Sequence, residues 1–570
     1  MATTRADLDH RFLCAIVGHQ TRQNQGFLRG EQECPTNDRF VGTPHELQLI
    51  HVGETIGFIA ELKEGISKMT ISFRLFAITC AFLSLPLLAN SADLPETRKA
   101  AQEGDAEAQY DLALIYDKGK SAPQDYEQAF NWYRQAAQQK HKEAQFSLGL
   151  MYENGEGVPR DYDKAVKWYR RAAQQGHAVA QNNLGVRYEN GQGVPQDYEK
   201  AVNWYQKAAQ QGYLLAENNL GAMYDKGQGI PQNYQKAFEW YLKAAQQGDA
   251  PAQFNVGSMY ENGDGVSKNH EKAVKWYRKA AHQGHADAQN AFGVYYENGE
   301  GVPQDYEKAV KWYRKAAQQG HVLAQNNLAI MHDKGRGTPQ NYKKAFEWYR
   351  KAAQQGDAPA QFNLGSMYIR GKDIAQDYQK AFNWFHRAAQ QGYVDAQFAL
   401  GSMYEAGKSV PRDYEKAVKW HRRAAQQGHA VSQNNLGVRY ENGQGVPQDY
   451  EKSVKWYRKA VSNGYAKAEH NLGAAYDAGE GVSQDYEKAA KLYEQAAQDE
   501  ISEAQYKLGH MYASGEGVLQ SYVRAYKWFD LAASNGNSRA REDRDVIDQR
   551  MTRDQVAEAK ELAQEWEPQR

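Results

Sequence analysis

The sequence has little cysteine and no excess of charge of either sign. Its three cysteines, Cys14, Cys34 and Cys80, all lie within the first 92 of 570 residues. No disulfide and no thiolate metal site can therefore form beyond that point. Lysine and arginine total 69, and aspartate and glutamate total 70. The chain as a whole thus has no electrostatic preference for nucleic acid or for an acidic membrane surface.

Long hydrophobic runs are also absent. The apolar run from Leu75 to Ala89 is interrupted by Pro86, and it is shorter than the roughly 20 residues that a membrane-spanning helix needs. A methionine and one basic residue precede it, and small residues lie between it and Asp93. Residues 69–92 therefore resemble a Sec signal peptide. We expect a periplasmic or secreted protein with no transmembrane span in its mature chain.

The 68 residues before Met69 have no periodicity and no kinship with the rest of the chain. A signal peptide does not normally begin so far into a chain. Codons for Lys63-Glu64-Gly65 can contain a bacterial ribosome-binding sequence, so we expect translation to start at Met69. Residues 1–68 are then an unstructured or mis-assigned extension. The alternative is a disordered leader that precedes a signal anchor.

Aromatic residues are abundant, with 38 tyrosines and 12 tryptophans, and a chain so rich in large rings can bury enough surface to fold. One pattern recurs every 36 residues from Asp105 to Gly536: A-x-x-x-L-G-x-x-Y-x-x-G-x-G-V-x-x-D-Y-x-K-A-x-x-W-Y-x-x-A-A-x-x-G. Only Leu492 breaks the tryptophan series, which consists of Trp132, Trp168, Trp204, Trp240, Trp276, Trp312, Trp348, Trp384, Trp420, Trp456 and Trp528. The pattern resembles the Sel1-like repeat family, relatives of tetratricopeptide repeats. The resemblance covers about three quarters of the chain and implies twelve repeats within residues 93–536.

One repeat, His177 to Gly212, predicts a helical hairpin. Apolar residues at spacings of four indicate a first helix, which glycines end and Pro195 keeps from resuming. Asp197 caps a second helix whose apolar positions recur at three and four. Gly212 closes the unit in a left-handed conformation. The small residue Gly185 lets the two helices approach closely.

A single hairpin cannot offset its own ordering entropy, so stability must come from stacking. We therefore expect an all-α, right-handed superhelical solenoid of helix-turn-helix repeats. Residues 537–570 predict C-terminal capping helices, the last of which starts at Thr552 with a capping box to Gln555. Val556, Ala559, Leu562, Ala563 and Trp566 give that helix one apolar face.

No residue set points to catalysis, to a cofactor or to a metal. The tryptophan and tyrosine columns are interpreted as core between hairpins, and the paired glycines as turns that lack the lysine of a phosphate-binding loop. Four histidines share one phase, His177, His285, His321 and His429, but successive repeats separate them too far to share an ion. We interpret them as solvated turn residues. No serine–histidine–carboxylate set stands out.

The predicted working surface is a row of asparagines just before the Leu-Gly position. Seven repeats carry one there: Asn183, Asn219, Asn255, Asn327, Asn363, Asn435 and Asn471. In the related tetratricopeptide fold this position faces the concave groove, where an amide can bind the backbone of a peptide. The preceding position supplies aromatic side chains at Phe146, Phe254, Phe362 and Phe398, which could add specificity. The alternative is that the asparagines bond their own inter-helix backbone.

These observations predict a non-catalytic scaffold of the bacterial envelope that binds proteins or peptides along its concave face, and not nucleic acid. Two other functions stay open. Some cysteine-rich Sel1-like proteins are linked to penicillin binding or β-lactam hydrolysis, but those carry a cysteine pair in each repeat and these repeats have none. A secreted effector that contacts host proteins is the other.

Overall fold

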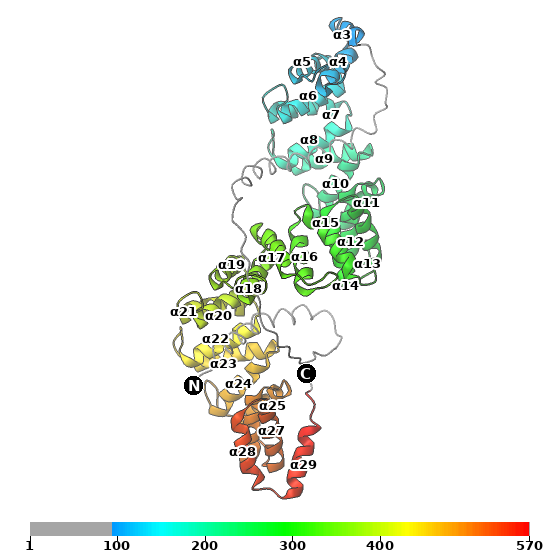
Figure 1. Cartoon of the computed structure of the whole chain (residues 1–570). Helices are drawn as coiled ribbons and strands as arrows, with labels where there is room; N and C mark the ends of the chain where they lie inside the picture. The colour runs from blue at the N-terminus through cyan, green and yellow to red at the C-terminus, as the bar shows by residue number, and fades with distance from the viewer. Residues whose placement is uncertain (1–93, 569–570) are drawn as a thin grey trace, which may run out of the picture. The chain divides into compact units, whose positions relative to one another are not determined.

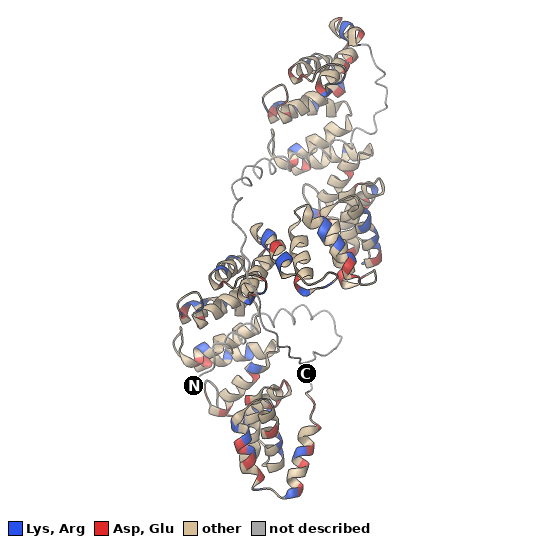
Figure 2. Ribbon diagram, viewed as in Figure 1, with Lys and Arg blue, Asp and Glu red and all other residues tan. Residues whose placement is uncertain are grey.

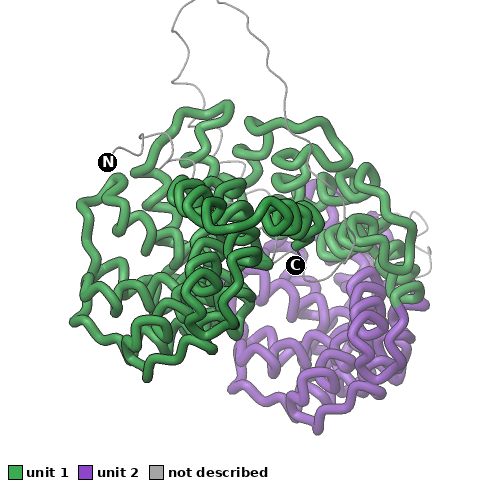
Figure 3. The backbone as a smooth tube through the Cα atoms, turned by 90° about the horizontal axis from the view of Figure 1, so that it is seen from below, with its two compact units in different colours: residues 1–29, 270–570 green, residues 30–269 purple. Residues whose placement is uncertain are grey.

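The computed structural model describes residues 94–568, and these residues contain 27 helices and no strand. They belong to two compact units, residues 94–269 and residues 270–568, which are drawn in different colours in Figure 3. Within each unit, helices that follow one another along the chain pack side by side, most of them as hairpins, in the order that Figure 1 shows. The predicted all-α fold of helix-turn-helix repeats is confirmed.

The first helix of each hairpin is called the A helix and the second the B helix. The A helices are α4 (Ala106–Lys118), α6 (Lys142–Asn154), α8 (Ala178–Asn190), α10 (Leu214–Lys226), α12 (Ala250–Asn262), α14 (Ala286–Asn298), α16 (Val322–Lys334), α18 (Ala358–Arg370), α20 (Val394–Ala406), α22 (Ala430–Asn442), α24 (Ala466–Ala478) and α26 (Ser502–Ser514). The B helices are α5 (Tyr126–Gln138), α7 (Tyr162–Gln174), α9 (Tyr198–Gln210), α11 (Tyr234–Gln246), α13 (His270–His282), α15 (Tyr306–Gln318), α17 (Tyr342–Gln354), α19 (Tyr378–Gln390), α21 (Tyr414–Gln426), α23 (Tyr450–Ser462), α25 (Tyr486–Gln498) and α27 (Tyr522–Ser534). Three further helices are α3 (Leu94–Gln102), α28 (Ser538–Asp548) and α29 (Arg553–Gln564).

Residues separated by multiples of 36 are called a column, which is named after one member. The predicted helix signals of the His177–Gly212 repeat are confirmed. Gly191 ends α8 in the left-handed conformation at φ 66°, and the Asp197 side chain accepts a hydrogen bond from the Lys200 N–H at the start of α9. Gly212 comes just after α9, at φ 77°. Each hairpin is thus delimited by local chemistry at both helices.

The Tyr205 column forms the centre of the core. Its members are almost fully buried, and Tyr205 itself is 0% exposed. A Cβ at Gly185 would lie 2.6 Å from the Tyr205 ring, so the glycine lets α8 lie directly against that ring. Close approach of the A helix to the B helix, expected from the small residues, is confirmed here.

The tryptophan column differs from the expectation that it is core. Trp528 is buried, but the other tryptophans are only half-buried. On most of them the Lys or Arg three residues further along the B helix lies over the ring, as Lys207 does at 4.3 Å from the centre of Trp204. Each such ring therefore has one face on the core and one face covered by an exposed cation, because the (i, i+3) spacing places the cation above it. Figure 2 shows lysines and arginines interspersed with aspartates and glutamates along the helices.

The predicted start of the C-terminal helix is confirmed, and this helix packs on the last hairpin. Thr552 and Gln555 form the reciprocal capping box, and Ala559 and Val556 pack on the cluster around Phe529. The Trp566 ring lies 6.0 Å from that of Trp528. No helix among residues 94–568 is long and apolar enough to cross a membrane.

Candidate functional site

The seven predicted asparagines lie at the middle of A helices, one in each of seven repeats. Asn363 is 6% exposed, and the other six are half-buried. The A helices expose few side chains of any kind, whereas the charged residues that face water lie mainly on the B helices. In each unit the asparagines therefore lie on a surface that is polar but only partly solvated.

Five of these asparagines donate a hydrogen bond from Nδ2 to the Oδ1 of an asparagine in the preceding repeat. The pairs are Asn219 to Asn182 (2.9 Å), Asn255 to Asn218 (3.1 Å), Asn327 to Asn290 (3.1 Å), Asn363 to Asn326 (3.3 Å) and Asn471 to Asn434 (2.8 Å). The bonds run between neighbouring A helices and not to the inter-helix backbone. An amide has two donor hydrogens and one acceptor oxygen, so a single bond leaves it further capacity.

The other two asparagines stand opposite a phenylalanine of the preceding repeat, which cannot accept such a bond. Asn183 is opposite Phe146 in this register and lies beside Asn182 and Tyr169. Asn435 is opposite Phe398, and its side chain makes no hydrogen bond within the described residues. Asn435 is therefore the member whose amide is least committed to the fold.

The four predicted phenylalanines do not share one environment. Phe146 and Phe254 are half-buried, and Phe146 stacks on His177 with ring centres 4.6 Å apart. Phe362 and Phe398 are 1% and 3% exposed and belong to a core cluster. Their burial leaves no ring face for a ligand, so only Phe146 and Phe254 remain candidates. Peptide binding by this row stays a prediction.

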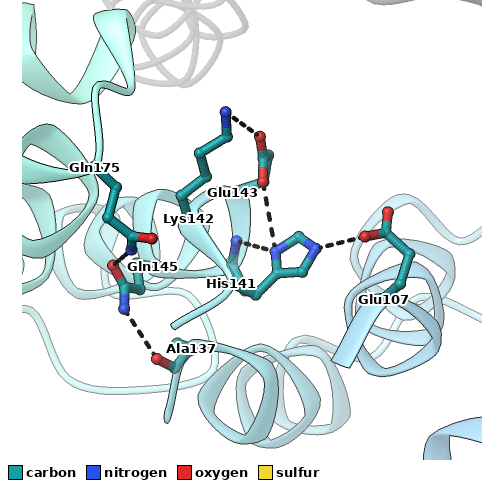
Figure 4. Close-up of polar contacts among 8 residues, drawn as sticks. Glu107, Ala137, His141, Lys142, Glu143, Gln145 and Gln175 are labelled. Carbon is teal, nitrogen blue, oxygen red and sulfur yellow. Dashed lines mark hydrogen bonds and ion pairs between the residues drawn. The ribbon is translucent and has the colours of Figure 1, made fainter. Parts of the chain in front are cut away.

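The histidines that share one phase are helix caps, and the expectation that they are solvated turn residues is wrong. The Nδ1 of His141, His177, His285, His321 and His429 accepts the N–H of the residue three positions on. His141 also lies 3.0 Å from Glu107 of the preceding repeat through Nε2 (Figure 4). An Nδ1 that accepts a hydrogen bond must be unprotonated. Burial accordingly lowers the pKa of His177.

A chain of glutamines links the repeats beneath these caps. Gln145 Nε2 donates to Ala137 O at 3.0 Å, and its Oε1 accepts from Gln175 at 2.8 Å (Figure 4). Equivalent bonds recur along the chain, for example between Gln325 and Gln355 at 2.8 Å. These buried amides are satisfied on both sides, so they hold successive hairpins in register and offer a ligand nothing.

Carboxylates on the A helices receive the hydroxyls of the Tyr205 column. Tyr169 donates to Glu153 at 2.6 Å, and Tyr313 donates to Glu297 at 2.6 Å. Burial, and after it the adjacent carboxylate, raises the pKa of both tyrosines far above the ordinary value. These carboxylates are thus acceptors fixed by the core, nearer the C-terminal ends of the A helices than the asparagine row.

One buried serine, histidine and carboxylate do meet, which the sequence did not reveal. His421 replaces tyrosine in the Tyr205 column, and its Nδ1 lies 3.4 Å from Ser432 Oγ while its Nε2 lies 3.2 Å from Glu405. Burial raises the pKa of Glu405, but His421 and Arg439 outweigh it and leave the pKa lowered. Ser432 and His421 are both 0% exposed, so no substrate reaches the hydroxyl. The sequence signal for this contact is that His421 and Ser432 both depart from the residue usual in their columns.

A cavity of about 260 Å³ opens where the repeat pattern is broken, and we call it the Ala475 cavity. It is lined by Glu441, Tyr450, Ser453, Val454, Tyr457, Asn471, Ala474, Ala475, Asp477, Ala478, Glu480 and Lys507. Ser453 replaces the alanine found at that position in the other repeats, and Ala475 stands in a column that elsewhere holds large side chains. The sequence signal for this site is departure from the repeat pattern, whereas the predicted site residues all stand at recurring positions.

Comparisons with known proteins agree on one family. The family model described as Sel1 repeat matches twelve segments, from residues 106–141 to residues 502–537. A protective antigen of uropathogenic Escherichia coli with an SLR fold is 38% identical, with a TM-score of 0.69 over 76% of this chain and 93% of that one. A Sel1 repeat protein of Oxalobacter formigenes is 35% identical, with a TM-score of 0.45 over 55% of this chain and 92% of that one. No curated protein matches the chain.

Proposed function

Because the chain belongs to the Sel1 repeat family, we propose that it is a non-catalytic scaffold that binds an extended segment of another protein along its A helices. The observation that carries this proposal is the asparagine row, one half-buried amide in each of several repeats. Its members keep hydrogen-bonding capacity after their bonds to the neighbouring repeat are made. Amides at a regular spacing suit the backbone of an extended peptide better than its side chains.

The test must separate binding from folding, because removing a donor asparagine also removes a bond between repeats. One variant replaces the donors Asn219, Asn255 and Asn471 by alanine. A matched variant replaces their acceptors, Asn182, Asn218 and Asn434, and so loses the same three bonds. We expect partner proteins captured by the wild-type chain to be retained by the acceptor variant and lost by the donor variant.

Asn435→Ala is the cleanest single change, since the side chain of Asn435 makes no hydrogen bond within the described residues. We expect unchanged thermal unfolding and weaker capture. Equal capture by the wild type, the donor variant and Asn435→Ala, at equal folded content by circular dichroism, would end the proposal.

We also propose that the protein acts outside the cytoplasm, in the envelope or beyond it. Support comes from the signal-peptide pattern at residues 69–92, which lies outside the described residues, and from the E. coli relative's being a protective antigen. Mass spectrometry of the N-terminal peptide after cell fractionation tests this. A mature chain that begins near Asp93 in an envelope or secreted fraction supports the proposal, and a cytoplasmic chain that retains residues 1–68 contradicts it.

A further inference from the structure

Two interfaces between repeats contain a largely buried arginine with three partners. Arg187 on α8 lies 3.1 Å from Glu153 on the preceding A helix through Nη2, and its Nη1 donates to Gln192 at 2.5 Å. Its guanidinium carbon also lies 5.6 Å from the centre of the Tyr162 ring. The guanidinium is therefore held by a carboxylate, an amide oxygen and an aromatic face, which together suit its planar, delocalised charge.

Arg439 on α22 repeats this arrangement seven repeats later. Its Nε lies 3.0 Å from Glu405, its Nη1 donates to Gln444, and its guanidinium lies 5.0 Å from the centre of Tyr414. The three partners stand at the same offsets from the arginine in both interfaces. The receptor for the guanidinium thus has the same three positions in both interfaces.

In the next interface along the chain the arginine is missing and its receptor is present. The column of Arg187 and Arg439 continues at Ala475, and the columns of their partners continue at Glu441, Tyr450 and Glu480. All four residues line the Ala475 cavity. Elsewhere this column holds a methionine in seven repeats: Met151, Met223, Met259, Met331, Met367, Met403 and Met511. Ala475 is the one small residue of this column among the twelve repeats, and it leaves the position of the arginine side chain unfilled.

The charges and hydrogen bonds around the cavity are also incomplete. Glu441 accepts a hydrogen bond from Tyr457 but forms no ion pair within the described residues, and neither does Glu480. Asp477 is paired with Lys507 at 3.1 Å, so the lining keeps two unneutralised carboxylates. Ser453 is 2% exposed, and its Oγ makes no hydrogen bond of acceptable geometry, although it lies beside Tyr457.

From these observations we propose that the Ala475 cavity binds a guanidinium group supplied by a ligand, which occupies the place that Arg187 and Arg439 fill in their own interfaces. Glu441 and Glu480 pair with the guanidinium, Tyr450 lies against its face, and Ser453 supplies a further hydrogen-bonding oxygen. A carboxylate at Glu480, where the other two interfaces have glutamine, makes this receptor more acidic than its templates. Two kinds of ligand carry a guanidinium group. One is an arginine of a bound peptide, and this alternative rests on the proposed function; the other is a free small guanidine.

Calorimetric titration of the full chain with N-acetyl-arginine amide tests the site directly. N-acetyl-citrulline amide has the same shape without the charge, and N-acetyl-lysine amide has the charge without the planar fork. We expect binding of the arginine probe to be about tenfold tighter than that of the lysine probe, because only a guanidinium makes two parallel hydrogen bonds to a carboxylate. No measurable heat with the arginine probe, or equal affinity for the citrulline probe, overturns the proposal.

Ala475→Arg and Ala475→Met close the site with residues that the same column already accommodates. We expect both variants to fold, and both to lose binding of the arginine probe. Binding that survives in either variant places the probe elsewhere and overturns the proposal. Glu441→Gln keeps the cavity and removes one charge, and we expect it to weaken binding by about tenfold.

Arg187→Ala should create a second site, because it leaves Glu153, Tyr162 and Gln192 in place. The wild-type interface at Glu441 already tolerates alanine there, so the variant is expected to fold. Two arginine probes bound per chain, where the wild type binds one, confirm that these partners form the receptor. A stoichiometry that stays at one contradicts it.

Longer probes identify the source of the guanidinium. An extended peptide with one central arginine that binds about tenfold more tightly than N-acetyl-arginine amide identifies a peptide arginine as the ligand. Equal affinities identify a free small guanidine. Asn471 belongs to both the cavity lining and the asparagine row, but Asn435 lies outside the lining. Because the probe titrations use no asparagine variant and Asn435→Ala leaves the cavity lining unchanged, the guanidinium site and the proposed peptide-binding row can fail separately.

Discussion

Two glycine columns have the same backbone conformation but different surroundings. Gly193 and Gly212 both have positive φ, at 71° and 77°. A Cβ at Gly193 would lie 2.3 Å from the Tyr162 carbonyl oxygen of the preceding repeat, whereas a Cβ at Gly212 would meet nothing within 4 Å. Where the chain lacks glycine in either column, the substitute still takes positive φ, as Ser121 does at 65°.

Gly212→Ala is therefore expected to destabilise the fold by about 1 kcal/mol, which is the usual strain of a left-handed alanine. Gly193→Ala adds a collision with backbone to that strain, and we expect it to cost at least twice as much. Urea unfolding of both variants, monitored by circular dichroism, measures the difference. Equal losses would show that the preceding repeat moves aside at little cost.

The burial of His470 changes how this residue responds to acid. Burial lowers the pKa of His470 to about 4, below the value of about 6.5 in an unfolded chain. As pH falls below 6.5 the unfolded state takes up the proton first, so stability present at neutral pH is lost down to about pH 4. We expect a loss of about 2 kcal/mol from this residue between pH 7 and pH 5.

The control is His470→Asn, because asparagine occupies the same position at Asn434 one repeat earlier. Urea unfolding of both proteins at pH 7 and pH 5 checks the prediction. The variant should lose less stability on acidification than the wild type. Parallel losses in the two proteins would assign the acid sensitivity to other groups, of which His177 and His285 also have pKa values lowered by burial.

At the scale of the helix, the start of the A helix accepts chemically different caps. Asp249 and Asp357 cap α12 and α18 with a carboxylate, whereas His321 caps α16 with a ring nitrogen. All three accept the N–H of the third helical residue, so the two side-chain types are interchangeable in geometry. Four other A helices, such as α10 and α24, have no side-chain cap.

Asp357→Ala should destabilise the fold by about 1 kcal/mol, and Asp357→His should recover most of that loss at neutral pH. Thermal unfolding of the two variants beside the wild type gives the comparison. At pH 5 the histidine variant should lose the benefit, since a protonated Nδ1 no longer accepts. A histidine variant as unstable as alanine at pH 7 would mean that the local backbone differs between α16 and α18.

Elements were easier to predict than the contacts between them. Asp197, Gly191 and Gly212 carry local signals, and they placed the helices correctly. The inter-repeat bonds of Asn219 and the capping by His177 depend on which residue stands one repeat away. That neighbour is set by the stacking of hairpins, which no local pattern describes. The cavity was not predicted from the sequence for a related reason. Ala475 matters because it lacks the large side chain that the same column carries in other repeats, which leaves Glu441, Tyr450 and Glu480 around an open space.

For the molecule as a whole, stability in a stacked array is a sum of local terms. Within residues 270–568 the interface at Ala475 lacks a large side chain that most other interfaces have. Native-state hydrogen exchange should therefore find lower protection in α23 and α24 than in α16 and α17. Ala475→Met should raise protection in α23 and α24 and leave α16 and α17 unchanged. Uniform protection in the wild type would contradict this prediction. If Ala475→Met gains stability and no longer binds the arginine probe, the open site costs the wild-type fold stability.

The bonds between repeats all join residues at fixed offsets, as Gln145 to Gln175 and Asn182 to Asn219 illustrate. If a whole number of 36-residue units is removed or added, the residues brought together at the new junction therefore have the same offsets as existing hydrogen-bond partners. Residues 177–198 and 429–450 differ only at Ala180 and Ser432, so genetic exchange between their coding segments would delete seven repeats without breaking the register. Recombination can therefore change the length of the protein in steps of whole repeats. Related strains are expected to carry versions of this protein with more or fewer repeats.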